Sequence, residues 1–329
     1  MTSADREEPP IVSFAIASYN SSAFLEEAVR SALAQRDVAI EILIVDDGST
    51  DGSDALAADL ARGDPRIRAL RTPSNGGPAA ARNVVLDEMR GEWFAILDSD
   101  DILLPDRTTR LLDLARRTGA DMVADDLAIF SGDPDTGESF LGTDFREIPA
   151  LPLERYLDHS VIYGTLPNFG FLKPMIRKDF LTRHGIRYDQ RMRIGEDDRL
   201  VLACLLSGAN YAIGSSAGYL YRKHEQSISH RLGPREADAM VRANEELAPI
   251  MRDGGTDVRT AFQRRAAAYR NAAAFAHAIA AMKNGRADRT LAQIIRHPGS
   301  IPLFMMPVRS KLARLSARTR RAAQGEKES

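Results

Sequence analysis

The chain of 329 residues has little cysteine and no excess of positive charge. Cys204 is the single cysteine, which excludes an intramolecular disulfide and any zinc site built from several cysteines. One thiol also fits a reducing compartment. Lysine and arginine number 44 against 46 acidic residues, giving a formal net charge of −2. Because nucleic-acid binding needs a basic footprint, we expect no nucleic-acid partner.

Long apolar runs are also missing. The sequence holds no stretch of about 18 uninterrupted apolar residues, so no membrane-spanning helix is expected. The opening residues, MTSADREEPP, are acidic and short of apolar side chains, unlike a signal peptide. We therefore expect a cytoplasmic protein whose residues 1–9 are disordered.

What the sequence does contain is a regular alternation of two patterns. Ile11–Ser18 and Ile40–Val45 are short, continuous apolar runs rich in β-branched residues, as buried strands are. A polar loop and a segment with apolar residues at helical spacing follow each of them. This order predicts βαβ units, and hence an α/β fold with a mainly parallel sheet and helices on both faces.

The pattern continues and then changes. Helices are predicted over 79–89 and 107–117, and further strands from Trp93 and over 121–130. After Pro234 only helical patterns remain, over 236–251 and over the alanine-rich stretch 258–284.

These changes divide the chain into expected parts. Residues 10–232 are predicted to form the α/β domain, with one half over about 10–130 and another over about 131–232. Residues 233–329 are predicted to be a helical extension that ends in a basic tail.

Polar loops follow several of the predicted strands. In a parallel sheet the loops at the carboxyl ends gather at one edge, where ligands bind. The loops in question are SYNSS from Ser18, DDGSTDGS from Asp46, NGGPAAARN from Asn75 and DSDD from Asp98.

The loop DDGSTDGS has two explanations. Asp47, Gly48 and Ser49 are typical of an Asx turn, and Asp51 or Ser53 can cap the next helix. Alternatively, the carboxylate of Asp47 can accept hydrogen bonds from a base or a ribose.

The loop NGGPAAARN is similarly open. Gly76 and Gly77 permit unusual backbone angles, and Pro78 suits the first position of a helix. Capping does not explain Arg82, one turn further on, which can approach a phosphate.

The stretch DSDD places Asp98, Asp100 and Asp101 directly after a buried strand. Three clustered carboxylates raise one another's pKa values unless a cation neutralises them. Oxygen ligands of this kind suit Mg²⁺ or Mn²⁺, which often bind substrate phosphates as well. The structural alternative is a solvated helix cap with surplus charge.

A second acidic group, in GEDDRL, precedes an apolar helix. Glu196, Asp197 and Asp198 can simply stabilise the start of that helix. A carboxylate that faces the same pocket as DSDD can instead act as a general base.

Five segments in this order, IASYN…FLEEAVRSALAQ, EILIVDDGSTDGS, NGGPAAARN, EWFAILDSDD and GEDDRL, resemble the bacterial family 2 glycosyltransferases with the GT-A fold. The resemblance covers about residues 10–230. The string ADMVADDLAIF is also similar to exopolysaccharide glycosyltransferases of the succinoglycan type. The resemblance implies an inverting transferase that uses a nucleotide-diphosphate sugar, most often UDP-linked, together with a divalent metal.

The resemblance also implies roles for individual residues. Asp47 would contact the nucleobase, Arg82 would lie near the diphosphate and Asp100 near the ribose or the metal. DSDD corresponds to the DXD motif of the family, with Asp101 the preferred metal ligand and Asp98 in support. His224, in YLYRKHEQSIS, would complete the metal or diphosphate site.

Asp197 would be the base, with Glu196 and Asp198 as alternatives. The nucleotide-sugar site would further include Ala17, Tyr19, Asn20, Gly76 and Ser99. Ala17 stands where many members have Thr or Pro, which leaves open which nucleobase the donor carries.

The C-terminal segment LAQIIRHPGSIPLFMMPVRSKLARLSARTRR mixes apolar side chains with arginines. Such a segment can lie on an anionic membrane surface, here the inner face of the cytoplasmic membrane. It can equally form a packed helical hairpin with a solvated basic face. A membrane location suits a polyprenyl-linked acceptor, although the acceptor can also be another saccharide.

Two other functions are weighed against a glycosyltransferase. A sugar nucleotidyltransferase would need a glycine-rich, basic loop after the first strand, where this chain has SYNSSAF. A non-catalytic protein that binds a nucleotide sugar would not need both DSDD and GEDD intact.

Overall fold

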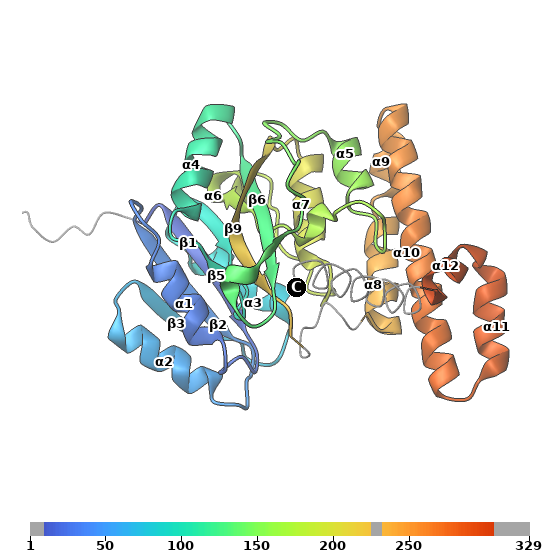
Figure 1. Cartoon of the computed structure of the whole chain (residues 1–329), viewed down its shortest axis with the longest axis horizontal. Helices are drawn as coiled ribbons and strands as arrows, with labels where there is room; N and C mark the ends of the chain where they lie inside the picture. Colours follow the sequence, from blue (N-terminus) through green and yellow to red (C-terminus); the bar gives the residue numbers. More distant parts are fainter. Residues whose placement is uncertain (1–9, 225–231, 306–329) are drawn as a thin grey trace, which may run out of the picture. The chain divides into compact units, whose positions relative to one another are not determined.

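The computed structural model describes residues 10–224 and 232–305 (Figure 1). The expected disordered N-terminus, the segment 225–231 and most of the basic tail lie outside the described residues. Among the described residues, 10–160 and 166–224 form one compact unit, and 161–165 and 232–305 form a second.

The first unit is built on one mixed sheet, with the strand order β3-β2-β1-β4-β8-β6-β9-β5 and with β7 paired to β6. The strands are β1 (Val12–Ser18), β2 (Ile40–Asp46), β3 (Ile67–Arg71), β4 (Trp93–Ile96), β5 (Ile102–Leu103), β6 (Met122–Phe130), β7 (Glu138–Ser139), β8 (Met175–Arg177) and β9 (Tyr211–Arg222). The predicted parallel sheet is confirmed for β3, β2, β1 and β4.

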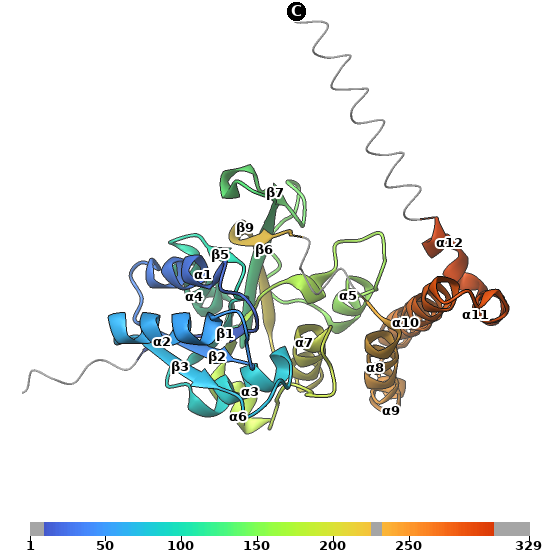
Figure 2. The same cartoon turned by 90° about the horizontal axis from the view of Figure 1, so that it is seen from below.

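Helices cover both faces of this sheet. They are α1 (Leu25–Leu33), α2 (Ser53–Gly63), α3 (Pro78–Glu88), α4 (Arg107–Thr118), α5 (Leu153–Asp158), α6 (Lys178–Arg183) and α7 (Glu196–Leu206), with 3₁₀ turns η1 (Pro134–Thr136) and η2 (Phe169–Phe171). Figure 2 shows α1 and α3 on opposite sides of the strands. The order β3-β2-β1-β4 explains this, because the chain reverses its direction across the sheet between β3 and β4.

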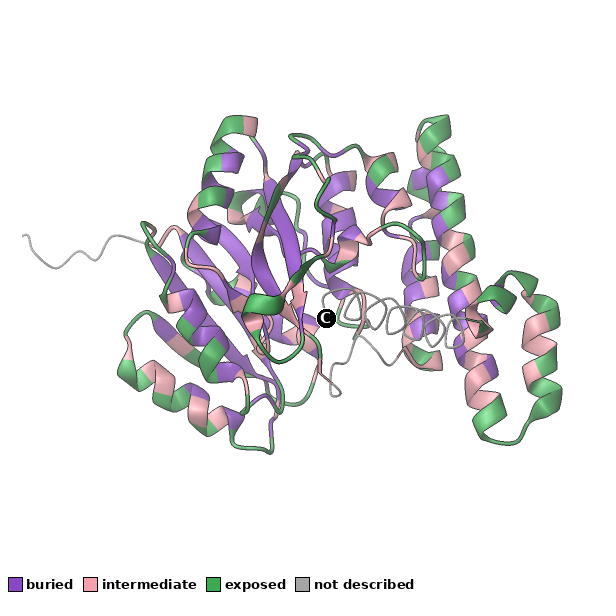
Figure 3. Cartoon of the chain, in the orientation of Figure 1, coloured by how far each residue is buried: buried purple, intermediate pink, exposed green. Residues whose placement is uncertain are grey.

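The central strands are buried on both faces (Figure 3). Phe14 and Ile16 of β1, and Ile42 and Ile44 of β2, have no exposed surface. A strand covered by helices on both sides needs apolar residues at every position rather than at alternate ones. That is why IVSFAI and IEILIV are continuous apolar runs.

The strand β8 runs antiparallel to β4 and was not anticipated from the sequence. Ala95 pairs with Met175, and Trp93 pairs with Arg177. In this register Lys173, just before β8, lies beside the residues that follow β4. An antiparallel strand therefore brings a distant lysine to DSDD.

The second unit consists of helices. They are α8 (Pro234–Glu245), α9 (Ala248–Arg252), α10 (Thr256–Lys283), α11 (Ala287–Arg296), the 3₁₀ turn η4 (Pro298–Ser300) and α12 (Ile301–Phe304). The single helix predicted over 236–251 is wrong, because the chain breaks before α9. Pro249 lies in the first turn of α9, where its missing N–H costs nothing.

Small residues let the helices of this unit approach closely. Ala237 of α8 packs with Ala273 and Ala276 of α10. In the same turn of α10, the ring of Phe275 meets the ring of Phe304 edge to face, with centroids 4.8 Å apart. Within residues 10–224 and 232–305, no helix has both the length and the apolar character needed to cross a membrane.

Candidate active site

The loops after β1 and β2 are joined by hydrogen bonds. The backbone N–H of Asn20 donates to Ser49 Oγ (3.0 Å), and the N–H of Thr50 donates to Asn20 Oδ1 (2.9 Å). Asn20 adopts a positive φ of 49°, which asparagine tolerates better than most residues. Asn20 therefore shapes the loop, while Tyr19 is 49% exposed and Ala17 is half-buried.

The side-chain cap that the sequence offered for the helix after DDGSTDGS does not form. Helix α1 begins after Phe24 and α2 after Gly52, neither with a capping side chain. Asp51 instead accepts hydrogen bonds from the N–H groups of Ser22 and Ser53. Burial by itself would raise the pKa of Asp51, but the hydrogen bonds from Ser53 and Ser22 lower it below the ordinary value.

Asp47 holds the loop that precedes α3. Its Oδ1 accepts from Thr72 Oγ1 (2.7 Å) and from the N–H of Gly76 (2.9 Å), and its Oδ2 accepts from the N–H of Gly77 (2.7 Å). Gly77 has a φ of 84°, and Pro78 starts α3 as predicted. The buried carboxylate of Asp47 is thus occupied by donors from Thr72 and from the loop before α3. The Asx-type turn is made by Asp46 instead, whose carboxylate accepts from the N–H groups of Gly48 and Ser49.

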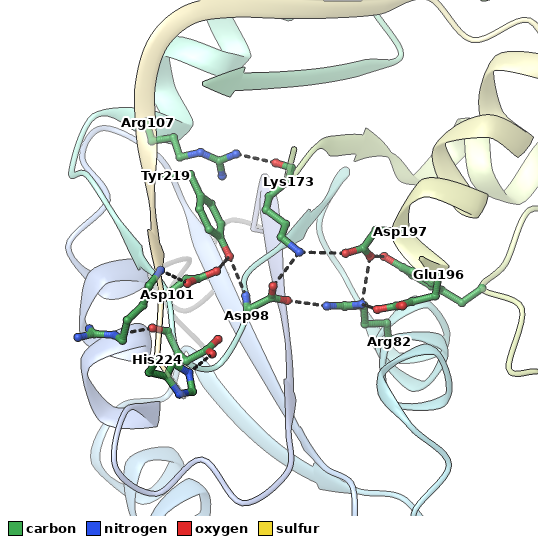
Figure 4. Close-up of polar contacts among 12 residues, drawn as sticks. Arg82, Asp98, Asp101, Arg107, Lys173, Glu196, Asp197, Tyr219 and His224 are labelled. Carbon is green, nitrogen blue, oxygen red and sulfur yellow. Dashed lines mark hydrogen bonds and ion pairs between the residues drawn. The ribbon is translucent and has the colours of Figure 1, made fainter. Parts of the chain in front are cut away.

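Arg82 connects the two acidic groups that the sequence singled out (Figure 4). Its Nη2 lies 2.6 Å from Asp98 Oδ1, and its Nη1 lies 2.7 Å from Glu196 Oε1 and 3.0 Å from Asp197 Oδ1. The side chain is buried at the first turns of α3. Arg82 therefore binds protein carboxylates in this structure.

Lys173 makes the same connection from the opposite side. Its Nζ lies 2.7 Å from Asp98 Oδ2 and 3.1 Å from Asp197 Oδ2 (Figure 4). Burial alone would raise the pKa of Asp98, but Lys173 and Arg82 lower it to about 2. Two buried cations therefore tie the end of β4 to the start of α7.

Asp197 receives a further donor from Tyr188, whose hydroxyl lies 3.1 Å from Asp197 Oδ1. Asn83 fixes Tyr188 by two hydrogen bonds: Nδ2 donates to the carbonyl of Tyr188 and Oδ1 accepts from its N–H, each at 3.0 Å. The segment ARN thus supplies one residue that binds Asp197 and one that positions its tyrosine partner.

Glu196 and Asp198 have different surroundings. Burial and the charge of Asp197 raise the pKa of Glu196 to about 7. Asp198 Oδ1 accepts from the hydroxyl of Tyr156 (2.8 Å). A Cβ added to Gly170 would lie 2.9 Å from Cβ of Asp198, so this carboxylate packs against η2.

Asp101 does not present its carboxylate to a ligand. Its Oδ2 accepts from the hydroxyl of Tyr219 and its Oδ1 from the N–H of Arg222, both at 2.8 Å (Figure 4). Asp101 is 1% exposed, and burial together with Asp100 and Asp98 raises its pKa well above the ordinary value. Both oxygens of Asp101 thus anchor β9, and its role as a metal ligand stays a prediction.

Asp100 and His224 lie together. His224 Nε2 is 2.7 Å from Asp100 Oδ2. Burial and the charge of Asp98 raise the pKa of Asp100. In the described part of the chain, no group of three or more His, Cys, Asp or Glu residues is arranged to hold a metal ion. The expected set Asp100, Asp101 and His224 is therefore not assembled, and Asp100 and His224 are the pair brought together.

A fully buried arginine, Arg107, contacts two residues of the site. Arg107 donates from Nε to Asp125 Oδ1 (2.9 Å) and from Nη2 to the carbonyl of Lys173 (2.6 Å). Its guanidinium lies 5.1 Å from the ring centroid of Tyr219. Arg107 thus contacts the backbone of Lys173 and the ring that binds Asp101.

Sequence reasoning missed Lys173, Tyr188, Tyr219 and Arg107. The one available signal for Lys173 was a lysine inside the apolar run FLKPMI. A charged residue in a buried strand requires a partner, but only the antiparallel register with β4 identifies Asp98 as that partner.

The sequence of residues 13–180 matches the family model described as Glycosyl transferase family 2. The chain belongs to this family. The glycosyltransferase is 35% identical to the succinoglycan biosynthesis protein ExoO of Rhizobium meliloti (strain 1021), over 95% of this chain and 89% of ExoO. It is 30% identical to ExoU of the same strain, over 90% of this chain and 86% of ExoU.

Solved structures support the fold. The structure of residues 1–349 of S. aureus TarS in complex with UDP-GlcNAc matches the glycosyltransferase with a TM-score of 0.59 at 16% identity. The match covers 87% of this chain and 92% of that chain. The predicted GT-A fold is therefore confirmed. Family membership also decides against a sugar nucleotidyltransferase.

Proposed function

We propose that this glycosyltransferase transfers a sugar, with inversion, from a UDP-sugar to a hydroxyl group of a saccharide or polyprenyl-linked acceptor. The product would be a cell-surface polysaccharide or an exopolysaccharide. The succinoglycan names of ExoO and ExoU support the product class, and the UDP-GlcNAc complex of TarS supports the donor class. The distances that join Asp98 and Asp197 through Arg82 and Lys173 support the proposed single displacement.

The observation that carries the proposal is the double bridge between Asp98 and Asp197. Arg82 and Lys173 each contact both carboxylates. Asp98 follows β4, at the carboxyl edge of the sheet where a nucleotide diphosphate is expected. Asp197 begins α7. The bridge fixes a base and a leaving-group site at one separation, as a single displacement requires.

Asp197 is the proposed base. The acceptor oxygen forms a bond to C1 of the sugar while the bond from C1 to the diphosphate oxygen breaks. The leaving nucleoside diphosphate keeps the electron pair, and the acceptor proton passes to Asp197. Lys173, Arg82 and the hydroxyl of Tyr188 orient the Asp197 carboxylate.

The neighbouring carboxylates take other proposed roles. Glu196 and Asp197 both accept from Nη1 of Arg82. Protonation of Glu196 therefore changes how strongly Arg82 stabilises the Asp197 carboxylate. Asp198 is assigned to packing against η2, because it accepts from Tyr156.

A divalent cation fits one part of the site. Asp100 and His224 offer an oxygen and a nitrogen at partly buried positions. Burial and the charge of Asp98 raise the pKa of Asp100, and a bound cation would oppose that shift. Mg²⁺ often needs only one or two carboxylates when substrate phosphates complete its coordination. Asp100 and His224 would hold Mg²⁺ or Mn²⁺, which when bound stabilises developing charge on the diphosphate.

The donor is proposed to lie along the loops after β1, β2 and β4. Tyr19 presents an exposed ring for the base, beside Ala17. Asn20, Asp47 and Gly76 shape this region through the loop hydrogen bonds, and Ser99 lies between the two aspartates of DSD. Arg82 acts on the diphosphate through Asp98 in this proposal.

The reaction is proposed to take place in the cytoplasm, at the inner face of the cytoplasmic membrane when the acceptor is polyprenyl-linked.

A panel of nucleotide sugars tests the proposal. With Mn²⁺ present, we expect release of UDP from one UDP-sugar, and release that increases when the acceptor is added. Product analysis by NMR is expected to give the anomeric configuration opposite to that of the donor. Retention of configuration would overturn the single displacement, and release from a GDP- or dTDP-sugar alone would overturn the UDP assignment.

A further inference from the structure

Helix α11 (Ala287–Arg296) lies in the second unit, and none of its residues is buried. It contacts α10, where Thr290 Oγ1 lies 3.4 Å from the carbonyl of Ala278. Leu291 is 58% exposed and Ile295 68% exposed. Residues four apart share one face of a helix, so these two side chains form an apolar strip on the surface.

The strip belongs to a local concentration of apolar surface. Five of the ten large apolar side chains exposed among the described residues lie between Met282 and Met305. The other three members besides the α11 pair are Met282, Ile301 and Met305. Single exposed apolar residues are ordinary, whereas a concentration of them marks an interaction surface.

Most of the charged residues around the strip are basic. Between residues 283 and 305 the basic residues are Lys283, Arg286, Arg289 and Arg296, and the acidic residue is Asp288. Arg289 and Arg296 are exposed and lie seven residues apart, so they project from the same side of α11, turned away from Leu291 and Ile295. The apolar strip thus lies on a helix whose polar side carries two arginines, with Asp288 next to the strip.

We propose that α11 docks on an anionic lipid surface, with Leu291 and Ile295 inserted below the headgroups and Arg289 and Arg296 in contact with them. An amphipathic helix with a cationic polar face binds in this way, lying in the plane of the interface. Lipid binding by α11 does not depend on the transfer reaction proposed for the first unit.

Charge decides between the possible occupants. A second copy of the chain placed symmetrically on the strip would cover the apolar side chains but would bring no opposite charge to Arg289 and Arg296. Residues 306–329 are rich in arginine and lysine, so they would repel the same arginines. An anionic lipid surface offers apolar depth and opposite charge at once.

Vesicle co-sedimentation of the full chain tests the proposal. The vesicles contain phosphatidylcholine alone or phosphatidylcholine mixed with phosphatidylglycerol. We expect pelleting with the anionic vesicles only. Ile295→Glu should weaken the partition coefficient by about tenfold or more, because an inserted apolar side chain is replaced by an anion. Arg289→Gln with Arg296→Gln should weaken it by about tenfold or more, at about fivefold for each arginine.

Ile250→Glu is the matched control. Ile250 is 54% exposed on α9 of the same unit and lies outside the strip, so its variant should pellet like the unchanged chain. Pelleting that Ile295→Glu leaves unchanged overturns the proposal, because binding then lies elsewhere in the chain. The proposal is equally overturned by equal binding to neutral vesicles, or by light scattering that shows a dimer lost in Ile295→Glu without any vesicle binding.

Discussion

Lys173 lies 2.7 Å from Asp98, although 75 positions separate them in the sequence, because β8 returns antiparallel beside β4. The same ammonium group reaches Asp197 at 3.1 Å. One buried lysine therefore links the acidic strand end to the acidic helix start.

Replacing Lys173 with methionine should affect both stability and transfer. The change leaves Asp98 and Asp197 with Arg82 as their shared cation, and breaking a buried ion pair from one side costs about 3–5 kcal/mol. We expect a loss of that size in the free energy of unfolding, measured by urea denaturation, and a fall in kcat. Lys178→Met is the control: Lys178 donates to the carbonyl of Met89 outside the carboxylate cluster. Equal effects of the two variants would refute a special role for Lys173.

Glu196 should make stability depend on pH. Burial and Asp197 raise its pKa from the ordinary 4.5 to about 7, so the folded state keeps a proton that the unfolded chain has released. This contribution is fully present below pH 4.5 and is lost as the pH rises through 7. It amounts to roughly 3 kcal/mol over that window. Glu196→Gln cannot titrate, so the stability difference between the two proteins should change by that amount between these limits. A difference that stays constant with pH contradicts the account.

Asp100 and Asp101 should respond differently to a metal titration. Asp100→Asn removes a carboxylate beside His224, so the Mn²⁺ concentration for half-maximal activity should rise by about tenfold or more. Asp101→Asn removes a carboxylate that already accepts from Tyr219 and Arg222, so the same titration should change little. The expected cost of Asp101→Asn is instead about 1 kcal/mol of stability. A large shift for Asp101→Asn alone would restore Asp101 as the ligand.

Arg107 should contribute strongly to the free energy of unfolding, although no role in binding the donor is proposed for it. Its side chain has no exposed surface, and Arg107→Leu leaves the buried carboxylate of Asp125 without its partner. We expect a loss of about 3–5 kcal/mol in the free energy of unfolding. Arg30 is the comparison, because its pair with Glu26 is exposed and Arg30→Leu should cost no more than about 1 kcal/mol. Urea denaturation of both variants would measure the difference.

The regular half of the fold could be predicted from the sequence because its signals are local. Continuous apolar runs such as Ile40–Val45 belong to strands buried on both faces, and the order of loops and helices gives their parallel arrangement. The strand β8 spans only Met175–Arg177, too short for a periodic signal, so its antiparallel pairing was not predicted. The break before α9 was missed because Pro249 was not treated as a helix start.

The acidic residues of the site were identified, but their partners were not. The pattern left open whether GEDD faces the same pocket as DSDD, and the structure connects Asp98 with Asp197 through Arg82 and Lys173. The sequence pointed to a cation as the answer to crowding in DSDD. The protein supplies much of that positive charge itself, and it turns Asp101 toward Tyr219. Such choices depend on side-chain direction, which motif spacing does not contain.

The central claim is that Asp197 accepts the proton while the remaining groups hold the donor. The most direct measurement compares Asp197→Asn with the unchanged chain, using sugar transfer and UDP binding by calorimetry in the presence of Mn²⁺. The account predicts that transfer falls by about 10²–10⁴-fold while the dissociation constant for UDP changes little. Transfer close to that of the unchanged chain, with UDP binding intact, would contradict it.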